Sequence, residues 1–247
     1  MDVKYAVPAL DRAHAVLGLL SEEPYQWKLS DLSRELGISK STLYSLLQTM
    51  ERLQWINRDS NETYAIGKSV GDFGSAYFRQ FDLIEEFRRL AKPVMRRLQE
   101  SIQLARLDGS DVLYLAKVEA PSPVQMVSGP GVRVPAHSTG LGKSLMSDMS
   151  AEQVRLLLPE EQLPKRTAHT IDNREQFIRE LEQVHLDGYA LDEQEGVMGF
   201  CCVSAPIRRR NEIVAAVSCS LPLYNWETGK AEALREIRSL AAELSSR

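Results

Sequence analysis

A run of short polar side chains between residues 39 and 48 has the residue types needed to read DNA. Ser, Thr, Tyr and Gln offer hydrogen-bond donors and acceptors to base edges, and a lysine can contact a phosphate or a guanine. If this segment is a helix, its polar residues lie on one face, opposite an apolar stripe. The residues assigned to DNA contact are Ser39, Lys40, Ser41, Thr42, Tyr44, Ser45 and Gln48, with Arg58 reaching the neighbouring groove or backbone.

The charge of this region gives only local support for DNA binding. Residues 1–67 hold seven Lys and Arg against nine Asp and Glu, a net charge of -2. Residues 38–58 hold three Lys and Arg against one Glu, a net charge of +2. A positive patch is the electrostatic footprint of a nucleic-acid site, and here it is confined to one segment. The alternative is a three-helix module that binds another protein through its polar face.

A second group of residues could bind a small carboxylate. The segment 139–142 opens a predicted helix directly after an extended segment, and the start of a helix favours an anion. Gly140 and Gly142 have no side chain beyond the backbone, so they would let a ligand approach it closely. This segment is therefore a candidate wall of a ligand pocket.

Two predicted strands near the end of the chain offer a second wall. Ser218 and Ser220 are two residues apart, so they share one face of a strand, and Cys202 and Ser204 share a face of the preceding strand. Asp192 follows in an acidic loop and could accept a hydrogen bond from a ligand hydroxyl or from a protonated acid. The alternative is that these are simply small residues in a half-buried strand.

The motifs of common enzymes are incomplete in this sequence. Gly142-Lys143-Ser144 resembles the end of a phosphate-binding loop, but the pattern needs glycine at position 137, where the chain has His137. The four histidines do not fall at metal-binding spacing, and neither a CxxC nor a GxSxG motif is present. We therefore expect no catalytic residue, no metal ion and no cofactor.

The elements that position the first group follow a recognisable order. Helical spacing of apolar residues predicts helices over 8–20, 31–36 and 40–53, with Ser30 or Asp31 capping the second and Ser39 the third. Gly37 suits the left-handed exit from the second helix, and 55–66 reads as a hairpin. This is the order of a winged helix-turn-helix. The expected buried stripe of the third helix is Leu43, Leu46, Leu47, Met50 and Leu53.

Helices and then a sheet are predicted for the rest of the chain. An amphipathic helix covers 84–98, and we expect a break or kink at Pro93 because proline removes a backbone donor. Apolar strands then alternate with helices, which indicates an α+β domain with an antiparallel sheet flanked by helices. The strands are expected at 103–108, 112–119, 124–128, 200–208 and 213–221, and the helices at 139–149, 173–185 and from about Thr228.

The composition excludes several classes of protein. The 247 residues are 43% apolar and 26% charged, which is typical of globular chains long enough for two domains. No stretch is long and apolar enough to span a membrane, and the charged start does not resemble a signal peptide. Three cysteines do not form a disulfide scaffold, so we expect a cytoplasmic protein with reduced thiols and no membrane partner.

Five motifs in the same order resemble those of the isocitrate-lyase-regulator (IclR) family of bacterial transcription factors. They are Ala9 to Ala13, Leu36 to Thr42, Pro135 to Ser144, Gly188 to Glu193 and Ser204 to Ile207. The resemblance covers nearly the whole chain. It implies a winged helix-turn-helix domain (1–67), linker helices (68–102) and a GAF-like effector-binding domain (103–247).

The resemblance also implies partners and a pocket. The partners are double-stranded DNA carrying a pseudo-palindromic operator, a small organic-acid effector, and further copies of the chain in a homodimer or homotetramer. Family positions that line the effector pocket correspond here to Val134, Gly140, Leu141, Asp192, Cys202, Ser218 and Ser220.

These observations favour a ligand-responsive transcriptional regulator, with repression favoured over activation. One alternative is a small-molecule enzyme of GAF-like fold with an appended interaction module, and another is a protein-binding adaptor. Steeply salt-dependent binding to duplex DNA would separate the regulator from the adaptor, since phosphate contacts release counterions.

Overall fold

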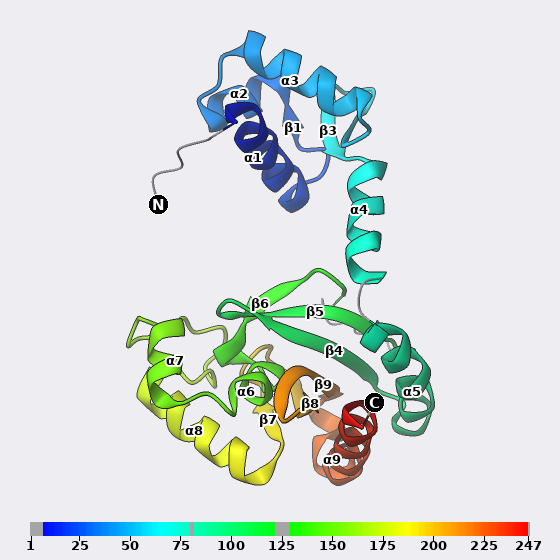
Figure 1. Cartoon of the computed structure of the whole chain (residues 1–247), viewed down its shortest axis with the longest axis vertical. Helices are drawn as coiled ribbons and strands as arrows, with labels where there is room; N and C mark the ends of the chain where they lie inside the picture. The colour runs from blue at the N-terminus through cyan, green and yellow to red at the C-terminus, as the bar shows by residue number, and fades with distance from the viewer. Residues whose placement is uncertain (1–6, 80–81, 122–128, 247) are drawn as a thin grey trace. The chain divides into compact units, whose positions relative to one another are not determined.

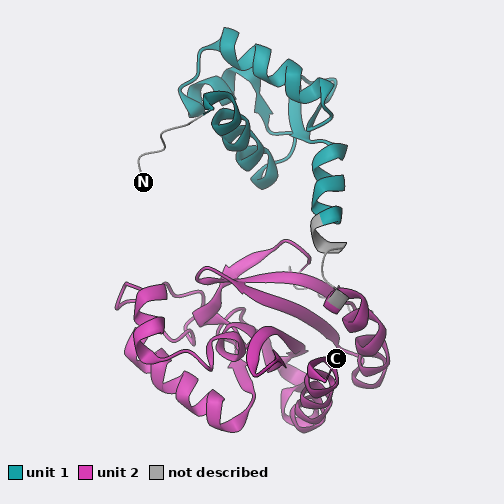
Figure 2. Cartoon of the chain, in the orientation of Figure 1, with its two compact units in different colours: residues 1–80 teal, residues 81–247 magenta. Residues whose placement is uncertain are grey.

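The computed structural model describes residues 7–79, 82–121 and 129–246. The chain divides into two compact units, residues 1–80 and residues 81–247 (Figure 2). None of the helices in these described ranges combines the length and the apolar character needed to cross a membrane. The strand predicted at 124–128 lies outside the described residues.

Three helices form most of the first unit (Figure 1). The glycine after the second helix, Gly37, has a φ of 64°, as the predicted left-handed exit requires. Ser39 caps the third helix, as predicted, and its Oγ accepts from the backbone N–H of Thr42. The cap predicted at Ser30 or Asp31 is wrong, because the second helix begins earlier, after Lys28. The helices are α1 (Pro8–Glu22), α2 (Leu29–Leu36) and α3 (Lys40–Arg52).

The predicted hairpin is present and belongs to a three-stranded antiparallel sheet of order β1-β3-β2. Its strands are β2 (Ile56–Arg58) and β3 (Thr63–Ile66), and the short β1 (Trp27–Lys28) was not predicted. The chain leaves the hairpin at Gly67, where a Cβ atom would lie 2.7 Å from the Ile56 nitrogen. Only glycine fits this close approach without a shift of the backbone.

The core of the first unit is made by the inner faces of its helices and its sheet. Leu43, Leu47 and Met50 are buried, as the apolar spacing of α3 predicted. Leu46 is only half-buried, and the expected burial of Leu53 is wrong, since 40% of this residue is exposed. The reason is that α3 ends at Arg52, so Leu53 no longer follows the helical periodicity.

Two helices follow the hairpin, α4 (Lys68–Arg79) and α5 (Asp82–Leu98). The break expected at Pro93 is not found, because α5 continues through this residue. Phe87 and Ala91 are fully buried on the face of α5 that contacts the second unit's sheet and last helix. This packing holds the helix together despite the backbone donor that proline lacks.

The second unit is built on a six-stranded antiparallel sheet of order β6-β5-β4-β9-β8-β7 (Figure 1). The predicted strands at 103–108, 112–119, 200–208 and 213–221 are present, while β6 and β7 were not predicted. The strands are β4 (Ser101–Asp108), β5 (Asp111–Val118), β6 (Arg133–Pro135), β7 (Ala190–Glu193), β8 (Phe200–Arg209) and β9 (Glu212–Pro222).

Helices cover both faces of this sheet. On one face Gly140 packs against the Cβ atom of Ser204, and on the other Gly229 of the last helix packs against Leu221. The predicted helix at 139–149 ends early, and the last helix begins five residues before Thr228. A short helix after the first of these was not predicted. The elements are the 3-10 helix η1 (Ala136–Ser138), α6 (Gly140–Met146), α7 (Ala151–Leu157), α8 (Arg174–Asp187) and α9 (Leu223–Ser245).

Candidate functional site

The polar residues predicted to contact DNA lie on the exposed side of α3. The seven residues between Ser39 and Gln48 in that set are all solvent-exposed. Some of their hydroxyls bond within the helix, as Ser45 Oγ does in donating to the Ser41 carbonyl at 3.2 Å. Lys40 forms no ion pair with any residue in the described ranges. This face therefore carries one uncompensated positive charge among short donors and acceptors, at the first turn of a helix.

Arg58 lies apart from this face, on β2 of the hairpin. Its guanidinium is 3.8 Å from the Glu62 carboxylate, across the turn. Such an exposed pair contributes little free energy, so it does not prevent Arg58 from contacting a phosphate.

The seven residues predicted to line an effector pocket surround one cavity of about 490 Å³ in the second unit. They come from β6, the start of α6, β7, β8 and β9, which are far apart in the chain. Seven more residues line the same cavity. The full lining is Tyr114, Val134, Thr139, Gly140, Leu141, Arg166, Asp192, Gly196, Val197, Met198, Phe200, Cys202, Ser218 and Ser220.

The sheet register explains why three of these residues meet. Asp192 pairs with Cys202 between β7 and β8, and Cys202 pairs with Ser220 between β8 and β9. Directly opposed residues of antiparallel strands share a face, so the three side chains form one row across the sheet. The Sγ atom of Cys202 and the Oγ atom of Ser220 are 3.3 Å apart. This row forms the floor of the cavity.

A glutamine that sequence reasoning missed holds the floor serines. The Oε1 atom of Gln103, on β4, accepts hydrogen bonds from Ser218 Oγ at 3.0 Å and from Ser220 Oγ at 3.4 Å. Gln103 is 1% exposed, and its Nε2 atom has no partner among the described residues. A buried amide is normally fully hydrogen-bonded, so the unpaired donor is unusual. The signal in the sequence was a single polar residue between Ile102 and Leu104.

Asp192 is a buried carboxyl group in the wall of the cavity. Its Oδ1 atom accepts from the backbone N–H of Glu195 at 2.6 Å and of Gly196 at 3.4 Å. Burial, helped by the nearby charge of Glu195, raises the pKa of Asp192 to about 7. The carboxyl group therefore changes its charge near neutral pH.

The loop that closes the cavity is anchored by a buried lysine. The Nζ atom of Lys143 donates to Glu195 at 2.6 Å, to Glu180 at 2.9 Å and to the Leu191 carbonyl at 3.0 Å. Burial opposes the charge of Lys143, but the two carboxylates outweigh it and raise its pKa. Thr170 Oγ1 also donates to the Glu195 carbonyl at 2.7 Å. In the described structure Lys143 thus serves an internal ion-pair network that ties α6 to the loop after β7.

The two glycines of α6 have different roles. Gly140 lines the cavity, as expected. The expectation that Gly142 also lets a ligand approach is wrong: a Cβ atom there would overlap the Ala136 backbone, so Gly142 permits close packing inside the protein. Its N–H is already bonded to Thr139 Oγ1 at 3.0 Å. Of the predicted helix start, Gly140 and Leu141 face the cavity and Gly142 does not.

The cavity residues that sequence reasoning missed close its mouth and its upper wall. Gly196, Val197, Met198 and Phe200 belong to the loop and strand start after β7, and Tyr114 lies on β5. They gave no signal, because nothing in their spacing relates them to α6. Thr139 and Arg166 complete this group, and Arg166 Nε donates to the Gly196 carbonyl at 3.2 Å.

The described residues contain no group of three or more His, Cys, Asp and Glu side chains placed to hold a metal ion. His137 is buried, with its Nε2 atom 2.9 Å from the Pro164 carbonyl and its ring edge-to-face with Phe177. Burial lowers the pKa of His137. Its position in the core agrees with a structural role.

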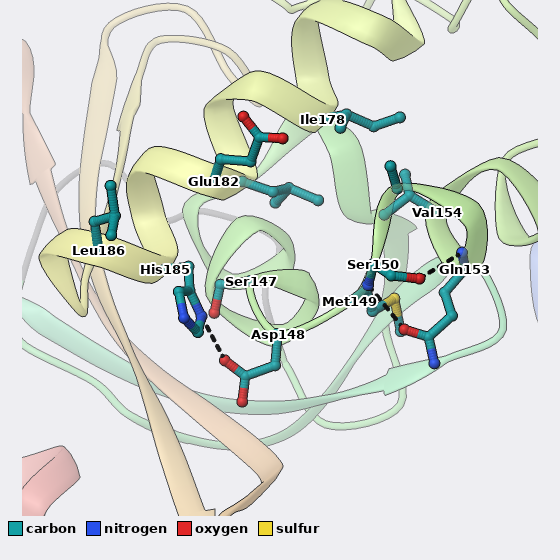
Figure 3. Close-up of a pocket in the computed structure, with 12 residues that line it drawn as sticks. Ser147, Asp148, Met149, Ser150, Gln153, Val154, Ile178, Glu182, His185 and Leu186 are labelled. Carbon is teal, nitrogen blue, oxygen red and sulfur yellow. Dashed lines mark hydrogen bonds and ion pairs between the residues drawn. The ribbon is translucent and has the colours of Figure 1, made fainter.

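A second, more open cavity of about 450 Å³ lies where α6, α7 and α8 meet (Figure 3). The His185 ring nitrogen Nδ1 is 3.0 Å from Asp148 Oδ1 at its edge, and Asp148 also pairs with Arg208. None of the residues predicted from the sequence lines this cavity. The polar row of the first cavity therefore remains the candidate ligand site.

A winged helix-turn-helix unit joined to an α+β unit with a buried polar cavity defines a class of protein, the DNA-binding regulators with a separate ligand domain. Residues 9–60 match the IclR helix-turn-helix domain, and residues 75–246 match the family of bacterial transcriptional regulator IclR C-terminal domains. The chain belongs to the IclR family of bacterial transcriptional regulators. The resemblance seen in the motifs, and the α+β class with its N-terminal winged helix-turn-helix, are confirmed.

Individual relatives agree with this assignment. The HTH-type transcriptional repressor AllR of Escherichia coli strain K12 is 30% identical over 220 residues, which cover 87% of this chain and 80% of AllR. The crystal structure of Thermotoga maritima IclR is 27% identical, with a TM-score of 0.80 over 97% of this chain and 98% of that one. An IclR homolog from Microbacterium hydrocarbonoxydans, complexed with 4-hydroxybenzoate, has the same fold at 21% identity, with a TM-score of 0.82 over 96% of this chain and 98% of that one.

Proposed function

We propose that this protein is a repressor whose affinity for its operator is set by a small organic acid bound in the cavity of the second unit. The observation that carries the proposal is the buried polar row of Asp192, Cys202 and Ser220, which faces a cavity rather than packing against other side chains. A buried polar row without such a purpose would cost free energy. The protein would act by binding, without turnover, and in the cytoplasm.

The DNA side of the proposal rests on α3. The exposed hydroxyls near its first turn, with Lys40 and Tyr44, match what a recognition helix places in the major groove. The start of the helix also favours a phosphate. We assign base or phosphate contacts to the α3 set and to Arg58. Residues 1–67 would be the DNA-binding domain, 68–102 the connecting helices and 103–247 the effector-binding domain.

The oligomeric part of the proposal follows from the form of the target. Two recognition helices in a homodimer would read a pseudo-palindrome, with half-site centres about 34 Å apart or a multiple of that distance. Pairing of two dimers into a homotetramer would let one assembly hold two operators. The oligomer is proposed as the unit that binds DNA.

The regulatory part requires unequal binding. An acid changes the operator affinity only if it binds the DNA-competent state and the other state with different affinities. By reciprocity, operator DNA then changes the affinity for the acid by the same factor.

The experiment is a two-part measurement on the full chain. DNA fragments enriched from random sequence by the protein define the operator, and fluorescence anisotropy gives its Kd with and without each of a panel of small organic acids. We expect binding that weakens steeply with salt and a Kd that rises at least about fivefold with the active acid. Salt-independent binding, or an acid that binds in calorimetry without changing the operator Kd, would contradict the proposal.

A further inference from the structure

A cation lies at the edge of the cavity without a charged partner. Arg166 lines the cavity, and its Nε donates to the Gly196 carbonyl at 3.2 Å, which fixes the guanidinium beside the closing loop. Within the described ranges no carboxylate lies within ion-pair distance of Arg166, and its two terminal nitrogens have no hydrogen-bond partner. A guanidinium binds carboxylates in a bidentate, charge-assisted manner, so this edge is prepared for an anion.

The floor of the cavity has the opposite polarity. Ser218 and Ser220 each have one hydroxyl proton, and both protons are donated to Gln103 Oε1. Toward the cavity the two hydroxyls therefore present only lone pairs. Because Gln103 is 1% exposed, water does not compete for its oxygen.

Asp192 adds to this acceptor character. Its Oδ1 atom is bound by two backbone N–H groups, and an ionised carboxylate has no donor to offer. A ligand carboxylate placed on the floor would meet these lone pairs and the negative charge of Asp192. A ligand hydroxyl placed there would donate to them. The floor thus favours hydroxyl groups, and the edge at Arg166 favours the carboxylate.

We propose that the effector is a hydroxylated carboxylic acid, oriented with its carboxylate on Arg166 and its hydroxyls on Asp192, Ser218 and Ser220. The proposal rests on the function proposed above and narrows its class of ligand. Arg166 is the specificity-determining residue for the acid group, and Gln103 is a positioning residue that acts through the two serines. A cavity of about 490 Å³ holds roughly sixteen volumes of liquid water, so a six-carbon acid fits within it.

The experiment compares three six-carbon probes on the full chain by isothermal titration calorimetry. Gluconate carries both the carboxylate and the hydroxyls, hexanoate carries only the carboxylate, and glucitol carries only the hydroxyls. The matching four- and five-carbon aldonates, alkanoates and alditols remove dependence on one stereochemistry or length. We expect at least one aldonate to bind more than tenfold tighter than its alkanoate and its alditol.

Two variants test the orientation. Arg166→Gln should weaken the best aldonate about tenfold or more, while Lys165→Gln, the neighbouring lysine that does not line the cavity, should not. Ser220→Ala should lower the preference for the aldonate over its alkanoate without changing the affinity for the alkanoate. Gln103→Glu keeps the acceptor oxygen and should retain more of the preference than Gln103→Leu.

Two results would overturn the proposal while leaving the function intact. One is an alkanoate that binds as tightly as every aldonate, and the other is unchanged aldonate binding in Arg166→Gln. A circular-dichroism melt shows whether each variant folds. If no acid of any class binds or alters operator affinity, the proposed effector function itself fails, and this inference fails with it.

Discussion

The two sites of this protein use the same polar residue types in opposite environments. On α3, Ser39, Ser41 and Ser45 are exposed and bond within their own helix, so they remain available to a partner in solution. In the second unit, Ser218 and Ser220 are buried and their protons are committed to Gln103. A surface site therefore keeps its hydroxyls adaptable, whereas a buried site fixes which of them donate and which accept.

The sites also differ in how many segments build them. One helix supplies seven of the eight residues assigned to DNA contact, while the cavity draws on β5 to β9, the start of α6 and two loops. The first site depends on a local periodicity, and the second depends on strand register and loop anchoring. Substitutions should therefore affect function alone in the first unit, and often function together with stability in the second.

The largest expected effect tests the surface site. Lys40→Ala combined with Tyr44→Ala should abolish measurable operator binding, because both side chains are exposed and assigned to DNA. Thermal stability should change by less than about 1 kcal/mol, since surface truncations are mild. Anisotropy and a thermal melt check both expectations. The matched pair Lys230→Ala with Tyr224→Ala, in the second unit, should keep the wild-type Kd; surviving binding in the first pair would remove α3 from the interface.

The next effect tests the buried site. Ser220→Leu should eliminate the response of operator binding to the acid, because the larger side chain enters the cavity and removes an acceptor. Operator affinity without the acid should stay near the wild-type value. The check is an anisotropy titration at increasing acid concentration. An unchanged dose response would show that this strand does not touch the effector.

A third prediction concerns the anchoring of the cavity loop. Lys143→Met leaves the buried Glu195 carboxylate without its partner, so it should destabilise the second unit by roughly 3–5 kcal/mol in urea unfolding. Glu180 is more exposed and contributes less. Adding Glu195→Gln to Lys143→Met should recover part of the loss, because the unpaired charge is then gone. A loss below about 1 kcal/mol in the single variant would mean that the network does not hold the loop.

A fourth prediction uses the charge of Asp192. Because its pKa in the folded protein is about 7 and its unfolded value is near 4, its contribution to stability is complete below pH 4 and is lost as the pH rises to 7. Relative to Asp192→Asn, the wild type should lose a few kcal/mol across this window. Urea unfolding at pH 4, 5.5, 7 and 8 measures the difference. A difference that is constant with pH would place the Asp192 pKa at its ordinary value.

The smallest expected effect lies in the hairpin of the first unit. Glu62→Ala removes the partner of Arg58 and should change the free energy of unfolding by less than about 0.5 kcal/mol, because the pair is exposed. Operator affinity should rise slightly, since a negative charge near the proposed DNA face is removed. A clear fall in affinity would indicate that Arg58 needs Glu62 to hold its position.

The sequence by itself determined the elements whose information is local. Helical spacing, the Ser39 cap and Gly37 predicted α3 and the turn before it, because these signals act within a few residues. The same holds for the hairpin and for the four long strands. Short elements such as β1, β6, β7 and α7 were missed, since tertiary partners rather than their own sequence stabilise them.

Only the tertiary structure decided the chemistry of the cavity. The spacing of Ser218 and Ser220 showed that they share a face, but not that Gln103 takes both of their protons. Nothing near Arg166 in sequence indicated that it lines the cavity, and Lys143 resembled part of a phosphate loop until its carboxylate partners were seen. Hydrogen-bond direction, burial and pairing depend on residues that are distant in sequence, and folding alone brings those residues together.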